Sequence, residues 1–382
     1  MITKIEILAD DVHVHFDGDN SEIFPNIWLR DHAKDEQNWD KRSSQRKTYT
    51  AALDINLKVK KAEIIENGKY LSVSWPDLEK PVKYSSEFLT NNKIKKKKEV
   101  KSNLKIWKAN EIKEEIFLDY NSILSNEGFR NFLKNIYDYG FSVIKNCETN
   151  LKSVETIANR IGYVRNSIFG GLWSFQSDEN KADSAYTQEE LRPHTDSTYS
   201  NDAPGLQLLL CCEYNARGGE SIMVDGLKIA EIIKKENQPM YELMTKINVK
   251  GNYIGDGVYL EAERPIFKLN ENNEIVQVSF NNYDRAPFRF EKDLTLKFYE
   301  AIKTFDIIAN NKDYQWRHIL KPGELLIFNN WRILHGRGSF NGVRKMSGCY
   351  INKEDFDSSC NCLLYTSPSP RDRTRSRMPS SA

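Results

Sequence analysis

Short apolar runs that alternate with polar residues are frequent in the first hundred residues of this chain. Residues 12–16 alternate strictly, and residues 70–75 predict a strand that Pro76 ends. Residues 93–98, which read Lys-Ile-Lys-Lys-Lys-Lys, are typical of an exposed linker edge. We therefore predict a small β-rich N-terminal domain over residues 1–100.

Beyond this linker, two amphipathic helices precede a series of short strands. Apolar residues recur at helical spacing over residues 118–139 and again over residues 151–161. Residues 205–212 then predict a strand, residues 215–219 a turn and residues 220–226 the returning strand. The second part of the chain is thus predicted to be strand-rich with a few helices.

The strands continue towards the end of this predicted second domain. Residues 323–328 are an apolar run that leads to His335, and Ser339-Phe340-Asn341-Gly342 signals a hairpin turn before a strand that starts at Arg344. On this pattern His335 and Arg344 lie on antiparallel neighbours and reach one pocket. Many short strands with few helices indicate a mainly β fold with flanking helices, with a double-stranded β-helix (jelly roll) over residues 115–360.

The triplet His194-Thr195-Asp196 carries the chemistry that suits such a pocket. Together with His335 it makes a two-histidine, one-carboxylate set, which holds Fe(II) on one face and leaves the opposite face open. By itself a His-x-Asp triplet is more often a solvated turn. Arg344 changes that balance, because a guanidinium is the natural partner of a dicarboxylate such as 2-oxoglutarate. Without the nearby histidine, Arg344 reads as a salt bridge at a strand edge.

Composition narrows the class of protein without identifying it. Of the 382 residues 39% are hydrophobic and 29% are charged, and 55 basic against 54 acidic residues give a net charge near +1. We therefore expect no nucleic-acid partner and, with no long apolar run, no membrane partner. The first residues resemble neither a signal peptide nor a transit peptide. This predicts a cytoplasmic protein, with the mitochondrial matrix left open in case a targeting segment is missing.

Residues 362–382 break the pattern of the rest of the chain. They change abruptly to serine, proline and arginine with no apolar periodicity. One interpretation is a disordered basic tail. The interpretation that we prefer is that this string resembles a translated sequencing-library adapter, which predicts a non-native tail without function.

Four longer strings resemble a known family. They are AYTQEELRPHTDSTY, GGESIMVDG, FNNYDRA and NNWRILHGRGSFNGVRKMSGCY, and they resemble the carnitine-biosynthesis dioxygenases of the iron- and 2-oxoglutarate-dependent, taurine-dioxygenase-like (TauD/TfdA) superfamily. The resemblance implies iron ligands at His194, Asp196 and His335, and 2-oxoglutarate contacts at Arg344 and Ser221. It also implies dioxygen as a substrate, ascorbate as the reductant, and a homodimer as a candidate assembly.

The same resemblance implies a small-molecule substrate with a quaternary ammonium group. Aromatic ring faces suit such a cation, because it cannot donate hydrogen bonds. A carboxylate at Asp183 favours trimethyllysine, hydroxylated at C3, over γ-butyrobetaine. Another quaternary-ammonium hydroxylase and a non-catalytic jelly-roll binding protein are the alternatives. The substrate residues that the resemblance implies are Phe169, Trp173, Asp183, Tyr186, Asn281, Asn282 and Tyr350.

The predicted N-terminal domain departs from the family. The string Trp28-Leu29-Arg30-Asp31-His32 matches it, but Ala33-Lys34-Asp35-Glu36 follow where members place cysteines that bind structural zinc. We therefore expect no zinc in this domain, which must rely on its apolar core.

Overall fold

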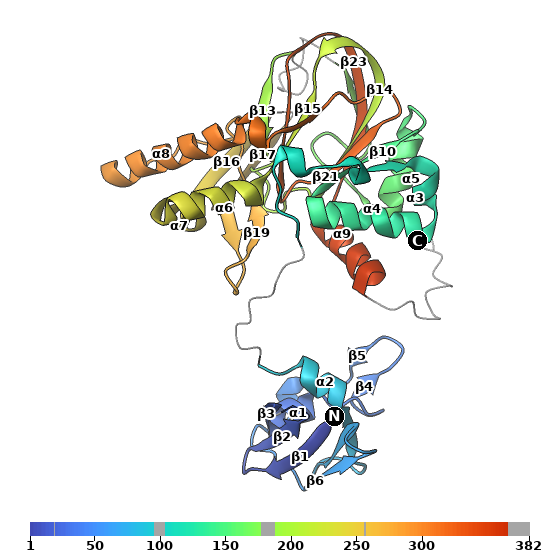
Figure 1. Ribbon diagram of the computed structural model, residues 1–382. Helices are drawn as coiled ribbons and strands as arrows, with labels where there is room; N and C mark the ends of the chain where they lie inside the picture. The colour runs from blue at the N-terminus through green and yellow to red at the C-terminus, as the bar shows by residue number, and fades with distance from the viewer. Residues whose placement is uncertain (19, 95–103, 177–187, 256, 366–382) are drawn as a thin grey trace. The chain divides into compact units, whose positions relative to one another are not determined.

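The structure is a computed structural model that describes residues 1–18, 20–94, 104–176, 188–255 and 257–365. Contacts divide the chain into two units, Met1–Lys101 and Ser102–Ala382, which Figure 1 shows as ribbons. Within the described ranges, no helix combines the length and the apolar character that are needed to cross a membrane.

The described part of the first unit consists mainly of small antiparallel sheets. One sheet has the strand order β1-β2-β3 and another β6-β7-β8, and β4 pairs with β5. The strand predicted for residues 70–75 is confirmed as β7. The bounds are β1 Ile2–Ile7, β2 Asp11–Phe16, β3 Asn20–Pro25, α1 Asn26–Asp31, β4 Trp39–Asp40, β5 Gln45–Arg46, η1 Thr50–Ala52, β6 Lys61–Ile65, β7 Tyr70–Ser74, β8 Val82–Ser85 and α2 Ser86–Asn91.

Alternation along β2 decides which face of the first sheet is buried. Val12, Val14 and Phe16 lie in the core of the unit. Because successive side chains of a strand point to opposite faces, His13 and His15 face away from that core.

Two sheets enclose the interior of the second unit. Among the described residues one sheet has seven strands, in the order β11-β23-β14-β21-β10-β9 with β12 also paired to β23. The other has four strands, in the order β13-β22-β15-β20, and β16–β17 and β18–β19 form separate hairpins. The bounds are β9 Phe117–Asp119, β10 Phe141–Lys145, β11 Val164–Arg165, β12 Trp173–Gln176, β13 Leu191–His194, β14 Leu206–Gly218, β15 Ser221–Asp225, β16 Asn248–Gly255, β17 Val258–Pro265, β18 Phe267–Leu269, β19 Ile275–Val278, β20 Trp316–His318, β21 Leu325–Asn329, β22 Ile333–Arg337 and β23 Phe340–Ile351.

Helices cover the outer faces of both sheets (Figure 1). Apolar residues of α4 and α5 share a core cluster with β14, β21 and β23, whereas those of α6, α7 and α8 pack on β15. The bounds are η2 Ala109–Glu111, η3 Glu114–Ile116, α3 Tyr120–Leu124, α4 Asn126–Tyr139, α5 Leu151–Ile161, α6 Gly226–Glu236, α7 Gln238–Lys246, α8 Lys292–Ala309, η5 Lys312–Tyr314, α9 Lys353–Cys360 and η6 Asn361–Tyr365.

The period of two along β22 selects the side chains that reach the interior. Leu334 packs outward with the helices α6 to α8, while Ile333 packs into the cluster between the sheets. His335 and Arg337 therefore point inward, like Ile333.

The same alternation operates in β23 on the opposite sheet. Met346 packs between the sheets and Cys349 packs outward against the helices. Arg344 and Tyr350, at even-numbered positions like Met346, therefore also point inward.

The hairpin predicted between His335 and Arg344 is wrong. β22 and β23 follow one another in sequence but belong to opposite sheets. His335 lies opposite His194 in its own sheet, whereas Arg344 lies opposite Tyr214 in the other. A turn signal reports only local conformation, and here the chain uses it to cross between sheets. The two side chains still meet, but across the interior.

The turn predicted for residues 215–219 is wrong for a similar reason. β14 runs unbroken from Leu206 to Gly218 and pairs with β23 along its length. The chain turns only at Gly218 and Gly219, whose φ angles of 82° and 76° lie in the left-handed region that glycine tolerates. Long-range pairing with β23 thus overrides the local turn signal, and the next strand joins the other sheet.

The first predicted helix is divided in two. α3 ends at Leu124, and the hydroxyl of Ser125 caps α4 by accepting the N–H of Gly128 at 3.0 Å. Gly140 ends α4 with a φ of 84°, as predicted, and the second predicted helix is confirmed as α5.

Candidate metal centre and active site

A cavity of about 850 Å³ opens in the interior of the second unit. Its walls include the inward faces of β13, β15, β22 and β23. Asn282 lines a separate small pocket, and Asp183 and Tyr186 lie outside the described residues. The cavity collects the other predicted site residues, namely Phe169, Trp173, His194, Asp196, Ser221, Asn281, His335, Arg344 and Tyr350.

Strand pairing brings the two predicted histidine ligands together. His194 is the last residue of β13 and lies opposite His335 of β22, and their ring centroids are 4.4 Å apart. Asp196 follows just after the strand. Its Oδ1 lies 3.5 Å from Nε2 of His194 and 3.5 Å from Nε2 of His335. Three potential ligand atoms thus lie within 4.8 Å of one another.

Asp196 is held in place by Tyr350 of β23 and by Asn330, which follows β21. The hydroxyl of Tyr350 donates to its Oδ2 at 2.9 Å. The buried side chain of Asn330 accepts the Asp196 N–H at 2.8 Å and donates to the carbonyl oxygens of Asp196 and Pro204. These contacts fix both the backbone and the side chain, so Oδ1 is left to face the histidines.

The electrostatics of the cluster favour the ligand forms of these groups. Burial lowers the pKa of His335 to about 4, so this imidazole is neutral at physiological pH. Burial opposes the ionisation of Asp196, but His335, His194 and the Tyr350 hydroxyl together hold its pKa below the usual range. The pKa of His194 is raised, because the hydrogen bond and charge of Asp196 outweigh the opposing effect of burial.

The donor set fits a divalent metal ion. The Nδ1–H of His194 donates to the carbonyl oxygen of Arg192 at 2.8 Å, which leaves the Nε2 lone pair directed at Asp196. The His335 ring packs on Phe328, with centroids 4.6 Å apart, and its Nδ1 has no hydrogen-bond partner in the described part of the chain. Two imidazoles and one carboxylate on one side of an open cavity are the facial set typical of non-haem Fe(II) sites.

Arg344 brings a positive charge to the far wall of the cavity. Only 6% of its surface is exposed, and burial lowers the pKa of its guanidinium. Among the described residues no carboxylate pairs with it. A buried charge is costly unless an opposite charge compensates it, so this environment suits an anionic ligand. The hydroxyl of Ser221 lines the same cavity from β15.

The sequence reasoning missed Arg337, which lines the cavity beside Arg344. Its Nη2 donates to the carbonyl oxygen of Glu189 at 2.7 Å, and its guanidinium lies 4.9 Å from the Phe340 ring centroid. Burial and the neighbouring charge of Arg344 lower its pKa to about 10. Arg337 could have been predicted from the sequence, because it lies two residues after His335 on the same strand and therefore faces the same side.

A buried ion pair anchors the start of the β22 strand. Arg332 contacts both carboxylate oxygens of Asp225, at 3.0 Å and 2.7 Å, and also donates to the carbonyl oxygens of Asp138 and Lys105. Asp225 in turn caps α6 by accepting the Leu227 N–H. This network fixes the strand that carries His335.

Aromatic rings line the cavity near the candidate metal centre. Trp173 and Tyr350 have ring centroids 5.7 Å apart, and Phe169 lines the same cavity. Tyr283, which no sequence pattern had indicated, has its ring nearly perpendicular to that of His194, with the ring centroids 5.5 Å apart. Another missed residue is Asp284, a carboxylate in the cavity wall whose Oδ2 accepts the Asn281 side-chain amide at 2.9 Å.

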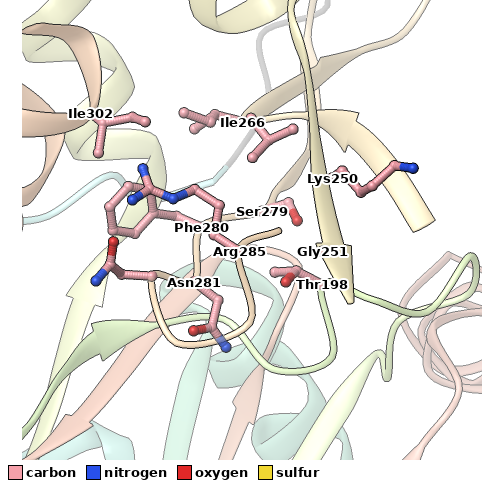
Figure 2. Close-up of a pocket in the computed structure, with 11 residues that line it drawn as sticks. Thr198, Lys250, Gly251, Ile266, Ser279, Phe280, Asn281, Arg285 and Ile302 are labelled. Atoms are coloured by element: carbon pink, nitrogen blue, oxygen red, sulfur yellow. The ribbon is translucent and has the colours of Figure 1, made fainter. Parts of the chain in front are cut away.

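A small pocket of about 20 Å³ lies on the other side of Asn281. Figure 2 shows Thr198 and Arg285 in its wall, and neither Thr198 Oγ1 nor Arg285 Nη1 has a hydrogen-bond partner among the described residues. A space of this size with two polar groups suits a single bridging water. We interpret it as a structural pocket that supports the loop carrying Asn281.

Comparison with known proteins identifies the family. The family model of the taurine catabolism dioxygenase TauD, TfdA family, matches residues 105–350. This chain belongs to the TauD/TfdA dioxygenase family. This membership confirms the family resemblance inferred from the four sequence strings, the jelly-roll fold class and the assignment as a dioxygenase.

Relatives within the TauD/TfdA family match both units. Trimethyllysine dioxygenase of Meyerozyma guilliermondii is 30% identical over 95% of this chain and 96% of its own length. The mitochondrial trimethyllysine dioxygenase of Homo sapiens is 32% identical over 87% of this chain and 80% of its length. The human γ-butyrobetaine dioxygenase is 25% identical over 87% of this chain and 89% of its length.

Proposed function

We propose that this TauD/TfdA family member hydroxylates N6,N6,N6-trimethyllysine at C3. One C–H bond becomes C–OH by gaining an oxygen atom from dioxygen, and 2-oxoglutarate takes the other atom and is converted to succinate and carbon dioxide. The observation that carries the proposal is the likeness, over 95% of the chain, to a protein named trimethyllysine dioxygenase. The γ-butyrobetaine enzyme is a more distant match, with 25% identity.

His194, Asp196 and His335 are the proposed Fe(II) ligands. Fe(II) held at these three residues supplies the dioxygen chemistry of C–H hydroxylation when 2-oxoglutarate is present. The protein contributes a neutral His335, an ionised Asp196 and a fixed carboxylate orientation. The open side of the cluster leaves room for the co-substrate and dioxygen.

Arg344 is the proposed partner of the distal carboxylate of 2-oxoglutarate, with Ser221 as a hydroxyl donor to it. The support for this assignment is a buried guanidinium in the same cavity as the metal ligands. A bound carboxylate compensates the buried charge and gains charge-assisted hydrogen bonds.

The substrate residues of the proposal divide into an aromatic and a polar group. Trp173, Tyr350 and Phe169 offer ring faces to the trimethylammonium group, at about 0.5–2 kcal/mol for each favourable contact. Asn281 and Asp284 offer polar atoms to the ammonium and carboxylate groups at the amino-acid end. Asp183 and Tyr186 remain predicted substrate contacts, and the proposal does not rest on them.

We further propose the conditions under which the enzyme works. Ascorbate keeps the iron reduced, and no cysteine-bound zinc is needed, because the cysteine ligands of the family are missing near His32. Homodimer formation and a location in the cytoplasm or the mitochondrial matrix are part of the same proposal.

A paired-substrate assay tests the proposed reaction. Purified protein is incubated with Fe(II), ascorbate and 2-oxoglutarate, and succinate is measured with trimethyllysine, with γ-butyrobetaine and without substrate. The proposal predicts succinate formation that depends on trimethyllysine, together with a hydroxylated product. Turnover of γ-butyrobetaine alone assigns the enzyme to the other substrate. Substrate-independent or absent succinate formation contradicts the proposal and favours a binding protein.

A further inference from the structure

The first unit contains a second cluster of two histidines and a carboxylate. His13 and His15 are two residues apart on β2 and share the face that points away from the core. Glu6 of β1 is directly opposite His13 in the strand register. The ligand atoms of all three residues lie within 4.8 Å of one another.

We propose that Glu6, His13 and His15 form a separate metal site, which takes a divalent transition-metal ion such as Zn²⁺. Two alternate residues of one strand and a third residue across the strand pair converge on one point above the sheet. Such a site supplies three protein ligands and leaves a fourth position to water.

The distances within the cluster agree with this geometry. Ligand atoms at about 2.0–2.2 Å from a tetrahedral Zn²⁺ are separated by roughly 3.3–3.6 Å. The Nε2 of His15 lies 3.6 Å from Oε1 of Glu6, and the rings of His13 and His15 have centroids 4.2 Å apart. Only small side-chain adjustments therefore separate the cluster from a closed site.

The environment of the His15 Nε2 atom also favours metal binding at this cluster. It is buried and has no hydrogen-bond partner among the described residues, because 3.6 Å to Glu6 is too long for a hydrogen bond. A buried polar atom without a partner costs free energy. Coordination of a metal ion compensates that cost directly.

Lys4 is the natural competitor of a metal ion at this position. Its Nζ contacts Oε1 of Glu6 at 2.5 Å, and this hydrogen bond lowers the pKa of the Glu6 carboxyl. Glu6 is thus an ionised ligand whose charge is already shared with Lys4. A metal ion that binds Glu6 must take the place of this ammonium group, and it is repelled by the positive charge of Lys4. Removal of Lys4 is therefore expected to tighten metal binding.

This site differs in residues and surroundings from the cluster around Asp196. It also revises the expectation of no zinc in the first unit, which considered only cysteine ligands. The two sites lie in different units, so each can be removed without touching the other.

Metal stoichiometry in the full chain tests the proposal. Tag-free protein is dialysed against buffered Zn²⁺, and bound metal is counted by mass spectrometry for the wild type and for His15→Gln, Glu6→Gln and Asp196→Ala/His335→Ala. We expect about two bound ions in the wild type and about one in each variant. His32→Gln is the matched control, because it changes another histidine of the same unit outside the cluster, and it is expected to keep both ions.

Lys4→Gln distinguishes a metal site from an ion pair with only a structural role, because only a metal site gains Zn²⁺ affinity when Lys4 is removed. Its Zn²⁺ affinity at the N-terminal site, measured in the Asp196→Ala/His335→Ala background, is expected to rise at least about threefold when a nearby positive charge is removed. Lys83→Gln, which removes the same charge from the β8 strand, is expected to leave that affinity unchanged. Co²⁺ absorption in the visible range gives a second readout of tetrahedral coordination.

Several results would overturn the proposal. One is a single ion in the wild type that disappears with Asp196→Ala/His335→Ala. Another is undiminished Zn²⁺ binding in both His15→Gln and Glu6→Gln. Should His15→Gln fail to fold, the near-isosteric Glu6→Gln and the gain expected from Lys4→Gln decide the question.

Discussion

Two places in this molecule bring a pair of histidines to a carboxylate on paired strands, and their surroundings differ. At the cavity of the second unit, the side chains of His194, His335 and Asp196 are only 11%, 11% and 18% exposed. In the first unit, the side chains of His15 and Glu6 are 30% and 42% exposed. The donor types are the same, so the difference lies in what encloses them.

The cluster of His194, Asp196 and His335 lies in a cavity whose walls also orient its carboxylate and can bind a co-substrate. Tyr350 and Asn330 orient Asp196. Arg344 places a buried positive charge on the opposite wall of the 850 Å³ cavity, where it can pair with an anionic ligand. The cluster of Glu6, His13 and His15 is more exposed, and Glu6 already forms an ion pair with Lys4. We infer that the cluster around Asp196 serves catalysis. The cluster of Glu6, His13 and His15 serves metal binding alone.

Removal of one carboxylate from each cluster should separate the two roles most strongly. Asp196→Ala is expected to lower trimethyllysine-dependent succinate formation by about a thousandfold or more, because a catalytic metal contributes several kcal/mol. Glu6→Gln changes a residue of the other unit that does not line the cavity, and a surface substitution of this kind alters stability by only about 0.5 kcal/mol or less, so turnover should stay within about twofold. Steady-state assays of both proteins at the same concentration of added Fe(II) measure the contrast. Equal losses in the two variants would remove the distinction between the clusters.

The anchor of the β22 strand should matter next, through stability. Arg332→Met leaves the carboxylate of Asp225 buried without its positively charged partner. The free energy of unfolding is therefore expected to fall by about 3–5 kcal/mol. Arg317→Met on β20 is the control, because this arginine is exposed and bonds only to Gln315 in the described residues. Urea unfolding monitored by tryptophan fluorescence gives both values. A similar small loss in the two variants would show that the ion pair does not hold the strand.

Loss of the positive charge across the cavity should affect the co-substrate more than the metal. Arg344→Met is expected to raise the KM for 2-oxoglutarate roughly 30-fold or more, as expected when one partner of a buried charge pair is truncated. Lys345→Met alters the next residue of β23, whose side chain is exposed, and should leave the KM unchanged. An unchanged KM in Arg344→Met, or an equal rise in both variants, contradicts the assignment of Arg344.

The smallest expected effect tests the orientation of Asp196. Tyr350→Phe removes the hydroxyl that donates to Asp196 Oδ2 while the ring remains. Fe(II) affinity is expected to fall about 10–100-fold, because hydrogen bonds to metal ligands tune their affinity. Tyr241→Phe removes a buried hydroxyl in the outer helical layer and is the control. An unchanged Fe(II) affinity in Tyr350→Phe would contradict the role of the Tyr350 hydroxyl in orienting the carboxylate.

Local patterns in the sequence were sufficient to predict several of the residues that line the cavity. A histidine and a carboxylate two positions apart, together with His335 and Arg344, indicated a metal and an anion. The alternation of β22 also carried the position of Arg337, because a strand has a strict period of two. Such signals are contained within a few neighbouring residues.

Pairing between distant strands could not be predicted in the same way. The turn signals at residues 215–219 and at Ser339 to Gly342 were local, and the length and partner of β14 overrode the first of them. The approach of Glu6 to His13 depends on the register of β1 with β2, which no single strand encodes. Asn330 was missed because its role arises from a fold-dependent contact with Asp196.

The proposed hydroxylation is tested most directly by following oxygen from ¹⁸O₂ with trimethyllysine as substrate. Wild-type protein is expected to incorporate ¹⁸O into hydroxytrimethyllysine, with succinate formed in equal amount, and Glu6→Gln is expected to do the same. Asp196→Ala is predicted to form neither product. Unlabelled or absent hydroxytrimethyllysine from the wild type, or labelled product from Asp196→Ala at the wild-type rate, would contradict the proposed hydroxylation at this site.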